Sequence, residues 1–328
     1  MNYTIWITKQ CNMSCDYCYE KKRLTTTKMD MVTAQAVAGY IEKNNLQRVR
    51  IHYHGGEVFT NLVVIDYLSE RLNCNMIKTN LTTNGTILNS DVKRVLRRIS
   101  DISVSIDGDR TVYTSNRHLG SDISFDQLVE NIKNILYFFP HTSARMTVTP
   151  NNYKFLNQSI SFLISIGFKR IHYSLDYYSK KWTKIGLQDL WKILNSITGL
   201  KHKYRDIQID GIGDCVPHRL SACNGGTGRI DIYADGSIYP CTAVAGIEQF
   251  KIGDIWSGMD IKQEAYLQDI VGHEMKDNCI RCDYRSYCRG FRCRFVNYDM
   301  SGDLFCPGDT ICELQKLIME KYENSHIG

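Results

Sequence analysis

The feature that most constrains the fold is a regular alternation of short apolar and amphipathic segments up to about residue 200 of the 328-residue chain. The apolar segments predict strands at residues 3–8, 48–53, 77–82, 102–106, 144–149 and 170–175. The amphipathic segments predict helices near residues 31–44, 61–72, 89–98, 124–138, 153–166 and 187–198. Strand–helix units in such a series indicate a parallel sheet with right-handed crossovers.

The predicted class is α/β, in the form of a partial (β/α)6 TIM-like barrel. No G-x-G-x-x-G turn follows any predicted strand, which disfavours a dinucleotide-binding sheet. Helical regularity fades after residue 204, where glycine and cysteine become prominent, so we expect domains at residues 1–204 and 205–328. A region with few large apolar residues needs crosslinks to be stable, and bound metal clusters can provide them. A closing helix is expected at residues 312–322.

The 13 cysteines form two groups, three within residues 11–18 and nine within residues 215–312, with Cys74 between them. The chain shows no signal segment and no apolar run of roughly 18 residues, so we expect a cytoplasmic protein that uses its cysteines for metal rather than for disulfides. The net charge of +5 is too small to indicate binding to nucleic acid or to a membrane.

Cys11, Cys15 and Cys18 form a C-x3-C-x2-C motif directly after the first predicted strand, where loops of such barrels carry the chemistry. A cubane iron–sulfur cluster normally takes four cysteines, so three thiolates suggest that one iron is kept for another ligand. The alternative is a zinc knuckle completed by a distant histidine. It is disfavoured because zinc ligands usually come in C-x2-4-C pairs.

This motif, with Tyr17 before its last cysteine, resembles the signature of the radical S-adenosylmethionine (SAM) superfamily. The resemblance implies a [4Fe-4S] cluster on Cys11, Cys15 and Cys18 whose open iron binds the amino and carboxylate groups of SAM. Reduction of the cluster in that family cleaves SAM to methionine and a 5′-deoxyadenosyl radical, which abstracts a hydrogen atom from the substrate. An electron donor such as flavodoxin or ferredoxin is implied as a partner.

Further motifs at successive predicted strand ends fit the same family. His54-Gly55-Gly56-Glu57 resembles its GGEP element, which holds the SAM amino group, although Val58 replaces the proline. Thr83-Asn84-Gly85 resembles its TNG turn, and a serine and an arginine further on are implied to reach the ribose and carboxylate of SAM. The implied SAM-binding residues are Tyr17, His54, Gly55, Gly56, Glu57, Asn84, Ser105 and Arg117.

The sequence assigns no catalytic residue. Asp107, at the end of the fourth predicted strand, is a candidate for a proton acceptor on the substrate side. A carboxylate that caps a turn is the more ordinary role for such a residue.

The second group of cysteines resembles the SPASM extension of many radical SAM enzymes, which binds two auxiliary [4Fe-4S] clusters. The first cluster is implied to use Cys215, Cys223, Cys241 and Cys293. The second is implied to use Cys279, Cys282, Cys288 and Cys312, with Cys306 as the rival for the last position. Four residues instead of the usual three separate Cys288 from Cys293. A zinc ribbon explains only the C-x2-C pair.

The resemblance implies a radical SAM oxidoreductase that forms a thioether, C–C or C–O crosslink in a ribosomally made peptide. Oxidation of a protein side chain, as in sulfatase maturation, is disfavoured because Thr242 stands where that group carries an acidic base. Alternatives are a radical reaction on a small molecule and an electron-transfer or scaffold protein without catalysis. The expected partner is a peptide with a leader, recognised by a separate protein or by the barrel and cluster domain themselves.

Overall fold

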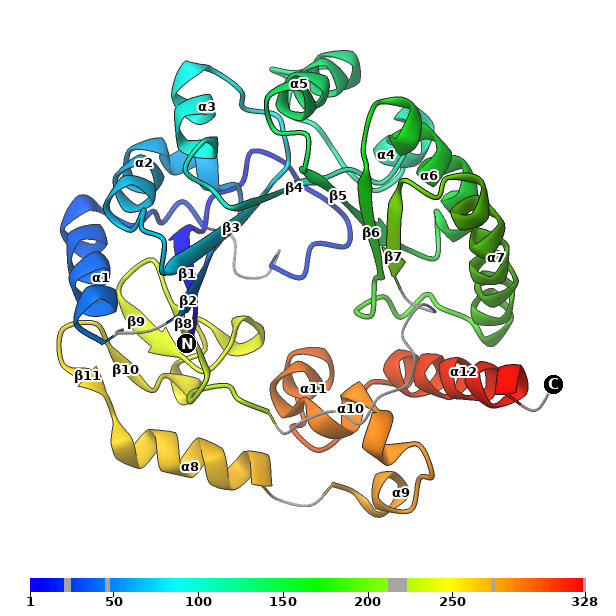
Figure 1. The fold of residues 1–328 in the computed structure, drawn as a ribbon. Coiled ribbons are helices and arrows are strands. Elements are labelled where there is room, and N and C mark those ends of the chain that lie inside the picture. The colour runs from blue at the N-terminus through cyan, green and yellow to red at the C-terminus, as the bar shows by residue number, and fades with distance from the viewer. Residues whose placement is uncertain (21–24, 45–47, 212–222, 273–274, 327–328) are drawn as a thin grey trace. The chain divides into compact units, whose positions relative to one another are not determined.

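The computed structural model describes residues 1–20, 25–44, 48–211, 223–272 and 275–326 (Figure 1). The chain divides into two compact units. The first unit comprises Met1–Ser105, Arg117–Ser143 and Asn224–Ile270, and the second comprises Ile106–Asn116, Ala144–Cys223 and Val271–Gly328. Neither unit ends at residue 204, so the division at that residue stays a prediction.

The first unit is built on a sheet whose strand order is β11-β10-β9-β8-β1-β2-β3-β4. Its parallel strands are β1 (Asn2–Thr8), β2 (Val49–Gly55), β3 (Ile77–Thr83), β4 (Asp101–Ser105) and β8 (Arg229–Ile232). Its short antiparallel strands are β9 (Ser237–Tyr239), β10 (Gly253–Asp254) and β11 (Gly258–Met259). Ile5 and Tyr53 are paired across β1 and β2 and are fully buried, so the core lies against these central strands.

Helices connect and cover the strands of the first unit. They are α1 (Met31–Asn44), η1 (Val58–Asn61), α2 (Leu62–Arg71), α3 (Ser90–Leu96), α5 (Phe125–Phe138), η3 (Thr242–Val244), η4 (Glu248–Phe250) and α8 (Ile261–Gly272). The start of α5 shows why these boundaries form. Ser124 and Gln127 make a capping box, which satisfies two backbone N–H groups that the helix leaves without partners.

The second unit contains the strands β5 (Ser143–Val148), β6 (Arg170–Leu175) and β7 (Gln208–Gly211) in that spatial order. Its longer helices are α6 (Leu156–Ser165), α7 (Lys184–Lys203), α11 (Arg294–Ser301) and α12 (Asp309–His326). Its shorter ones are α4 (Arg110–Thr114), η2 (Tyr153–Phe155), α9 (Asp277–Ile280), η5 (Arg285–Tyr287) and α10 (Arg289–Arg292). Helix α7 packs against α6 and α12.

The α/β class with a parallel sheet is confirmed, and each predicted strand and helix before residue 204 is present within a few residues. The closing helix expected at residues 312–322 is confirmed as α12, which begins earlier, at Asp309. The expectation that helical regularity fades after residue 204 is wrong in that α8 and α11 also lie there. Strands β7 to β11 were not predicted, since strands of two to four residues carry no readable periodicity. Closure into a partial barrel and the SPASM identity of the C-terminal region stay predictions. No helix of the described residues is long and apolar enough to cross a membrane.

Candidate functional site

The three N-terminal cysteines lie on one loop that follows β1. All three are half-buried, and the Cys18 N–H donates to the Cys15 carbonyl oxygen at 3.3 Å. Burial raises the pKa of Cys11 to about 11, and the charges of Glu57, Cys15 and Cys18 raise it further. None of the described cysteines forms a disulfide. The loop therefore brings three thiols close enough to influence one another electrostatically.

The backbone of Gly55 and Gly56 packs closely against the segment that leads into this cysteine loop. Gly56 N–H donates to the Thr8 carbonyl at 3.2 Å, and Glu57 N–H donates to the Gln10 carbonyl at 2.9 Å. A Cβ on Gly55 would lie 2.2 Å from the Thr8 oxygen, and one on Gly56 would lie 2.4 Å from the Gln10 oxygen. Only glycine permits this approach. The turn thus positions the backbone that leads directly into Cys11.

Glu57 uses its carboxylate inside the protein. The side chain is buried and accepts hydrogen bonds from Thr83 Oγ1 at 2.9 Å, from Asn84 N–H at 2.7 Å and from Phe59 N–H at 3.2 Å. Burial raises the pKa of Glu57, while these three donors lower it. The carboxylate therefore ties the end of β2 to the end of β3. A further contact with the SAM amino group, which the resemblance implies, stays a prediction.

Asn84 holds the cysteine loop from the other side. Its Nδ2 donates to Asn12 Oδ1 at 2.8 Å, and Asn12 Nδ2 in turn donates to Thr86 Oγ1 at 2.8 Å. Thr86 N–H closes this ring by donating to Asn84 Oδ1 at 3.0 Å. Asn12 is a positioning residue that the sequence reasoning missed, because its partners lie more than 70 residues away and no spacing pattern marks it.

Arg117 and Tyr17 meet at the same loop. Arg117 is buried, and its Nη1 lies 4.0 Å from Cys15 Sγ while its guanidinium lies 5.2 Å from the centre of the Tyr17 ring. The next residue, His118, accepts a hydrogen bond from Ser14 N–H at 3.3 Å and contacts the Asp16 carboxylate at 3.0 Å. Residues 117–118 are therefore docked along the cysteine loop.

His54 and Ser105 complete the predicted SAM-binding residues in the first unit. The His54 ring meets the edge of Trp6 at 4.5 Å, and its Nε2 lies 3.3 Å from the Tyr19 hydroxyl. Ser105 is the last residue of β4 and is half-buried. All of the predicted SAM-binding residues thus belong to one compact unit.

Asp107 belongs to the second unit and is buried. Its Oδ1 accepts a hydrogen bond from Thr147 N–H at 2.9 Å. This contact fixes the start of the second unit to β5, which is the structural role expected of a strand-end carboxylate.

Thr242, the residue after Cys241, lies beside a buried carboxylate that the sequence analysis did not predict. Thr242 Oγ1 donates to Asp231 Oδ2 at 2.8 Å and accepts from Arg229 Nη2 at 2.7 Å. Trp6 Nε1 also donates to Asp231 Oδ2, at 3.2 Å. Asp231 is fully buried, and burial raises its pKa. The sequence reasoning missed this carboxylate because it reaches Thr242 through the antiparallel pairing of β8 with β9, two strands that were not predicted.

The cysteines predicted for the second auxiliary cluster gather in the second unit. Burial raises the pKa of Cys279, Cys288 and Cys312. The charges of Cys288, Cys312, Cys282 and Cys306 raise the pKa of Cys279 as well. The charge of Cys282 also raises the pKa of both Cys288 and Cys312.

The cysteines predicted for the first auxiliary cluster are only partly described. Cys215 lies outside the described residues. Cys223 and Cys293 belong to the second unit, where both lie near the buried Arg294, and Cys241 belongs to the first unit. Burial lowers the pKa of Arg294, and the cysteine charges oppose this effect.

The donor chemistry of the two cysteine groups suits iron–sulfur clusters. Ligands of one zinc ion lie about 2.3 Å from the metal, and hence within about 4.6 Å of each other. Within the part of the chain that the structure describes, no three Cys, His, Asp or Glu side chains are spaced for a single ion. Three thiolates from one loop are the donor set that an iron–sulfur cluster takes when one of its irons is kept for another ligand.

Comparison with known proteins gives one family match and several similar chains. Residues 5–163 match the model of the radical SAM superfamily. The AdoMet-dependent heme synthase of Methanosarcina barkeri is 23% identical over 328 residues, covering 90% of this chain and 92% of that protein.

Solved structures show the same fold. Native anSMEcpe with bound AdoMet and Cp18Cys peptide has a TM-score of 0.74 at 18% identity, over 100% of this chain and 99% of that one. Streptococcus suis SuiB bound to its precursor peptide SuiA has a TM-score of 0.65 at 16% identity, over 95% of this chain and 75% of that one.

Proposed function

Since residues 5–163 match the model of the radical SAM superfamily, we propose that the chain is a radical SAM enzyme that modifies a peptide by forming an oxidative crosslink. When bound, the cluster and SAM supply a 5′-deoxyadenosyl radical that removes a hydrogen atom from the substrate. Cys11, Cys15 and Cys18 are the residues that would hold this cluster. The proposed auxiliary clusters would use the second group of cysteines and accept an electron from the substrate.

The observation that carries the peptide assignment is the fold likeness along nearly the whole chain to two structures solved with peptides, anSMEcpe and SuiB. The five cysteines at positions 279, 282, 288, 306 and 312 all belong to the second unit, and they support an auxiliary cluster in addition to the radical centre. An enzyme that only cleaves SAM has no need for such additional cysteines. Formation of a crosslink removes two hydrogen atoms from the peptide, so an acceptor for one electron is required.

The chain's own residues would organise this chemistry. The Gly55-Gly56 backbone and Asn84 hold the cysteine loop from two sides, which fixes the thiols before any ligand arrives. Asp231 beside Thr242 is a buried carboxylate that could receive the substrate proton through the threonine hydroxyl. This contact weakens the sequence argument against side-chain oxidation, since the acid is present on a neighbouring strand.

The test begins with protein purified and reconstituted without oxygen. Reduction in the presence of SAM should yield 5′-deoxyadenosine, and a Cys15→Ala variant should yield none. Peptides encoded by neighbouring reading frames are then added, and mass spectrometry should find a product lighter by two hydrogen atoms. SAM cleavage with no change in any such peptide would contradict the peptide assignment while leaving the radical chemistry intact.

A reaction on a small molecule is the second candidate. It is favoured by the 23% identity to the heme synthase across 90% of this chain. Transfer of deuterium from a labelled small molecule into 5′-deoxyadenosine, with every candidate peptide left unchanged, would support this candidate instead.

A further inference from the structure

The contact between Arg117 and Cys15 has a role that the SAM-binding assignment does not include. We propose that Arg117 is a positioning residue that raises the reduction potential of the cluster on Cys11, Cys15 and Cys18. This inference rests on the proposed radical SAM function, because it requires that the cysteine loop hold an iron–sulfur cluster. The resemblance to the family implied only that Arg117 contacts the carboxylate of SAM.

The first observation is the direction of the guanidinium. Arg117 Nη1 donates toward Cys15 Sγ at 4.0 Å, at the outer limit of a hydrogen bond to sulfur. Hydrogen bonds and positive charge at a ligand sulfur stabilise the reduced state of a cluster, since that state carries one more negative charge. A guanidinium stays protonated at every pH at which the protein is folded. Its effect on the potential is therefore permanent.

The second observation is burial. The Arg117 residue is only 6% exposed. Away from water, the attraction between a guanidinium and a thiolate-bound cluster is screened much less than it is at the surface. A long and flexible surface arginine at the same distance would contribute little.

The third observation is that the side chain is held in place. Its guanidinium lies over the Tyr17 ring at 5.2 Å, a cation–π contact with a residue of the same loop. The adjacent His118 is fixed twice, by Ser14 N–H at 3.3 Å and by Asp16 at 3.0 Å. Because the residues contacted all belong to the loop between Cys11 and Cys18, the position of the arginine is tied to that of the thiols.

The experiment measures the midpoint potential of the reconstituted holoenzyme by EPR-monitored titration in the absence of SAM and peptide. The relevant signal is identified in parallel samples as the one that SAM perturbs. Arg117→Gln should lower the ratio of reduced to oxidised cluster about tenfold at the wild-type midpoint, which equals about 59 mV for one electron. Arg117→Lys keeps the charge and should show a smaller shift in the same direction.

His118→Gln is the matched control. It removes the imidazole contact to Asp16 but keeps the backbone bond from Ser14 N–H and the contact of Arg117 with the Tyr17 ring, so its midpoint should lie much closer to that of the wild type than the midpoint of Arg117→Gln does. Midpoints of Arg117→Gln and Arg117→Lys equal to that of the wild type would overturn the inference. Should Arg117→Gln assemble no cluster, the Arg117→Lys midpoint alone decides. A chain that binds no iron at Cys11, Cys15 and Cys18 would instead contradict the proposed function itself.

Discussion

At the scale of single residues, the site depends on side chains and glycines that act on the cysteine loop without being thiols. Glu57 and Asn84 follow strands β2 and β3, and each reaches across to a segment that is distant in sequence. Gly56 acts by having no side chain at all. The loop is thereby held by backbone and amide contacts.

Gly56→Ala tests this arrangement. The added Cβ would lie 2.4 Å from the Gln10 carbonyl oxygen and 2.9 Å from Cys11 Cβ, so the loop must shift. We expect a loss of about 1–3 kcal/mol in the free energy of unfolding, together with reduced iron retention after reconstitution. Denaturant titration and iron analysis provide the two measurements.

Gly39→Ala is the control for this change. Gly39 lies on the exposed face of α1, and a Cβ added there would meet nothing within 4 Å, so alanine should stabilise the helix by about 0.5–1 kcal/mol. Equal stability and equal iron content of Gly56→Ala and wild type would show that the turn is not closely packed against the loop.

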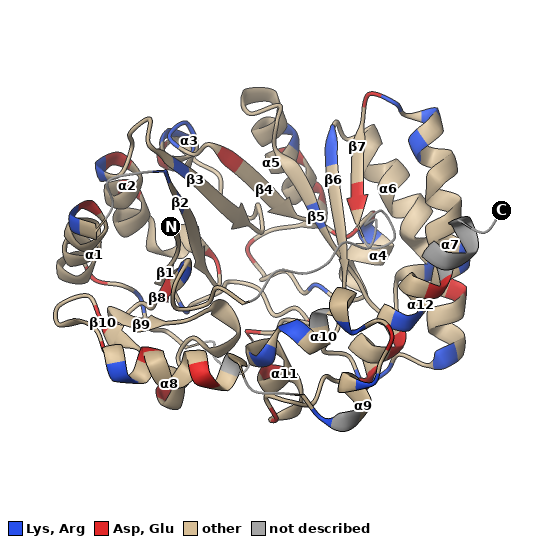
Figure 2. Cartoon of the chain, turned by 60° about the horizontal axis from the view of Figure 1, so that its bottom comes forward, with Lys and Arg blue, Asp and Glu red and all other residues tan. Residues whose placement is uncertain are grey.

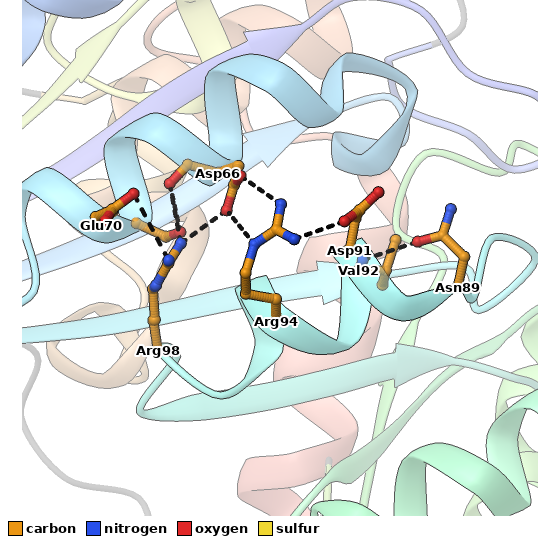
Figure 3. Close-up of polar contacts among 8 residues, drawn as sticks. Asp66, Glu70, Asn89, Asp91, Val92, Arg94 and Arg98 are labelled. Atoms are coloured by element: carbon orange, nitrogen blue, oxygen red, sulfur yellow. Dashed lines mark hydrogen bonds and ion pairs between the residues drawn. The ribbon is translucent and has the colours of Figure 1, made fainter.

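At the scale of elements, α2 and α3 are joined by an ion-pair network rather than by apolar contacts alone. Figure 2 shows charges of both signs on these two helices. The Asp66 carboxylate on α2 forms ion pairs with Arg94 Nη2 at 2.7 Å and with Arg98 Nη1 at 2.7 Å (Figure 3). Arg94 also forms an ion pair with Asp91, at 2.6 Å. The side chain of Arg98 is only 19% exposed, so water screens the Arg98–Asp66 ion pair less than it would screen a fully exposed pair.

Asp66→Asn should lower the free energy of unfolding by about 0.5–1 kcal/mol at neutral pH, the upper part of the range for partly exposed pairs. Hydrogen bonds and charge from Arg94 and Arg98 hold the pKa of Asp66 below its ordinary value of 3.8. Because the folded-state pKa is depressed, this stabilisation is complete above that value and is lost as the pH falls through the lowered pKa. Urea unfolding of both proteins from about pH 7 to about pH 3 measures the difference.

Glu70→Gln is the matched variant on the same helix. Glu70 is 71% exposed and pairs only with Arg98, at 3.6 Å, among the contacts of the network. This substitution should leave the free energy of unfolding nearly unchanged at every pH. A pH-independent cost for Asp66→Asn would assign its effect to packing instead of charge.

At the scale of the whole molecule, the cysteines of the second group are divided between the two compact units. Cys241 belongs to the same unit as the N-terminal triad, and the other described C-terminal cysteines belong to the second unit. Strand β8, which follows the described Cys223, lies beside β1 in the sheet of the first unit. Loading of the proposed clusters is therefore coupled to folding in both units.

Cys312→Ser and Cys306→Ser separate the rival ligands of the second auxiliary cluster. Cys312 is influenced by Cys282 and acts on Cys279 and Cys288, whereas Cys306 acts on Cys279. We expect Cys312→Ser to lose about one third of the iron of a three-cluster protein, and Cys306→Ser to retain all of it. Iron analysis and EPR of the reduced proteins decide, and the reverse pattern would assign Cys306 as the ligand.

Local sequence determined much of the architecture. Apolar periodicity was enough to predict strands β1 to β6 and the longer helices between them, because each period reflects which face of a single segment is buried. The five-residue helix α4 was not predicted. The spacing of Cys11, Cys15 and Cys18 resembles the radical SAM signature, and residues 5–163 match the model of that superfamily.

Only the tertiary structure decided how the site is held and what surrounds it. The carboxylate of Glu57 ties the end of β2 to β3 and to the turn that follows it, while Asp231 lies beside Trp6 because β8 pairs with β1. Arg117 reaches Cys15 across 102 positions of sequence. Contacts of this kind arise from the packing of distant segments, so no local period or spacing in the sequence can encode them.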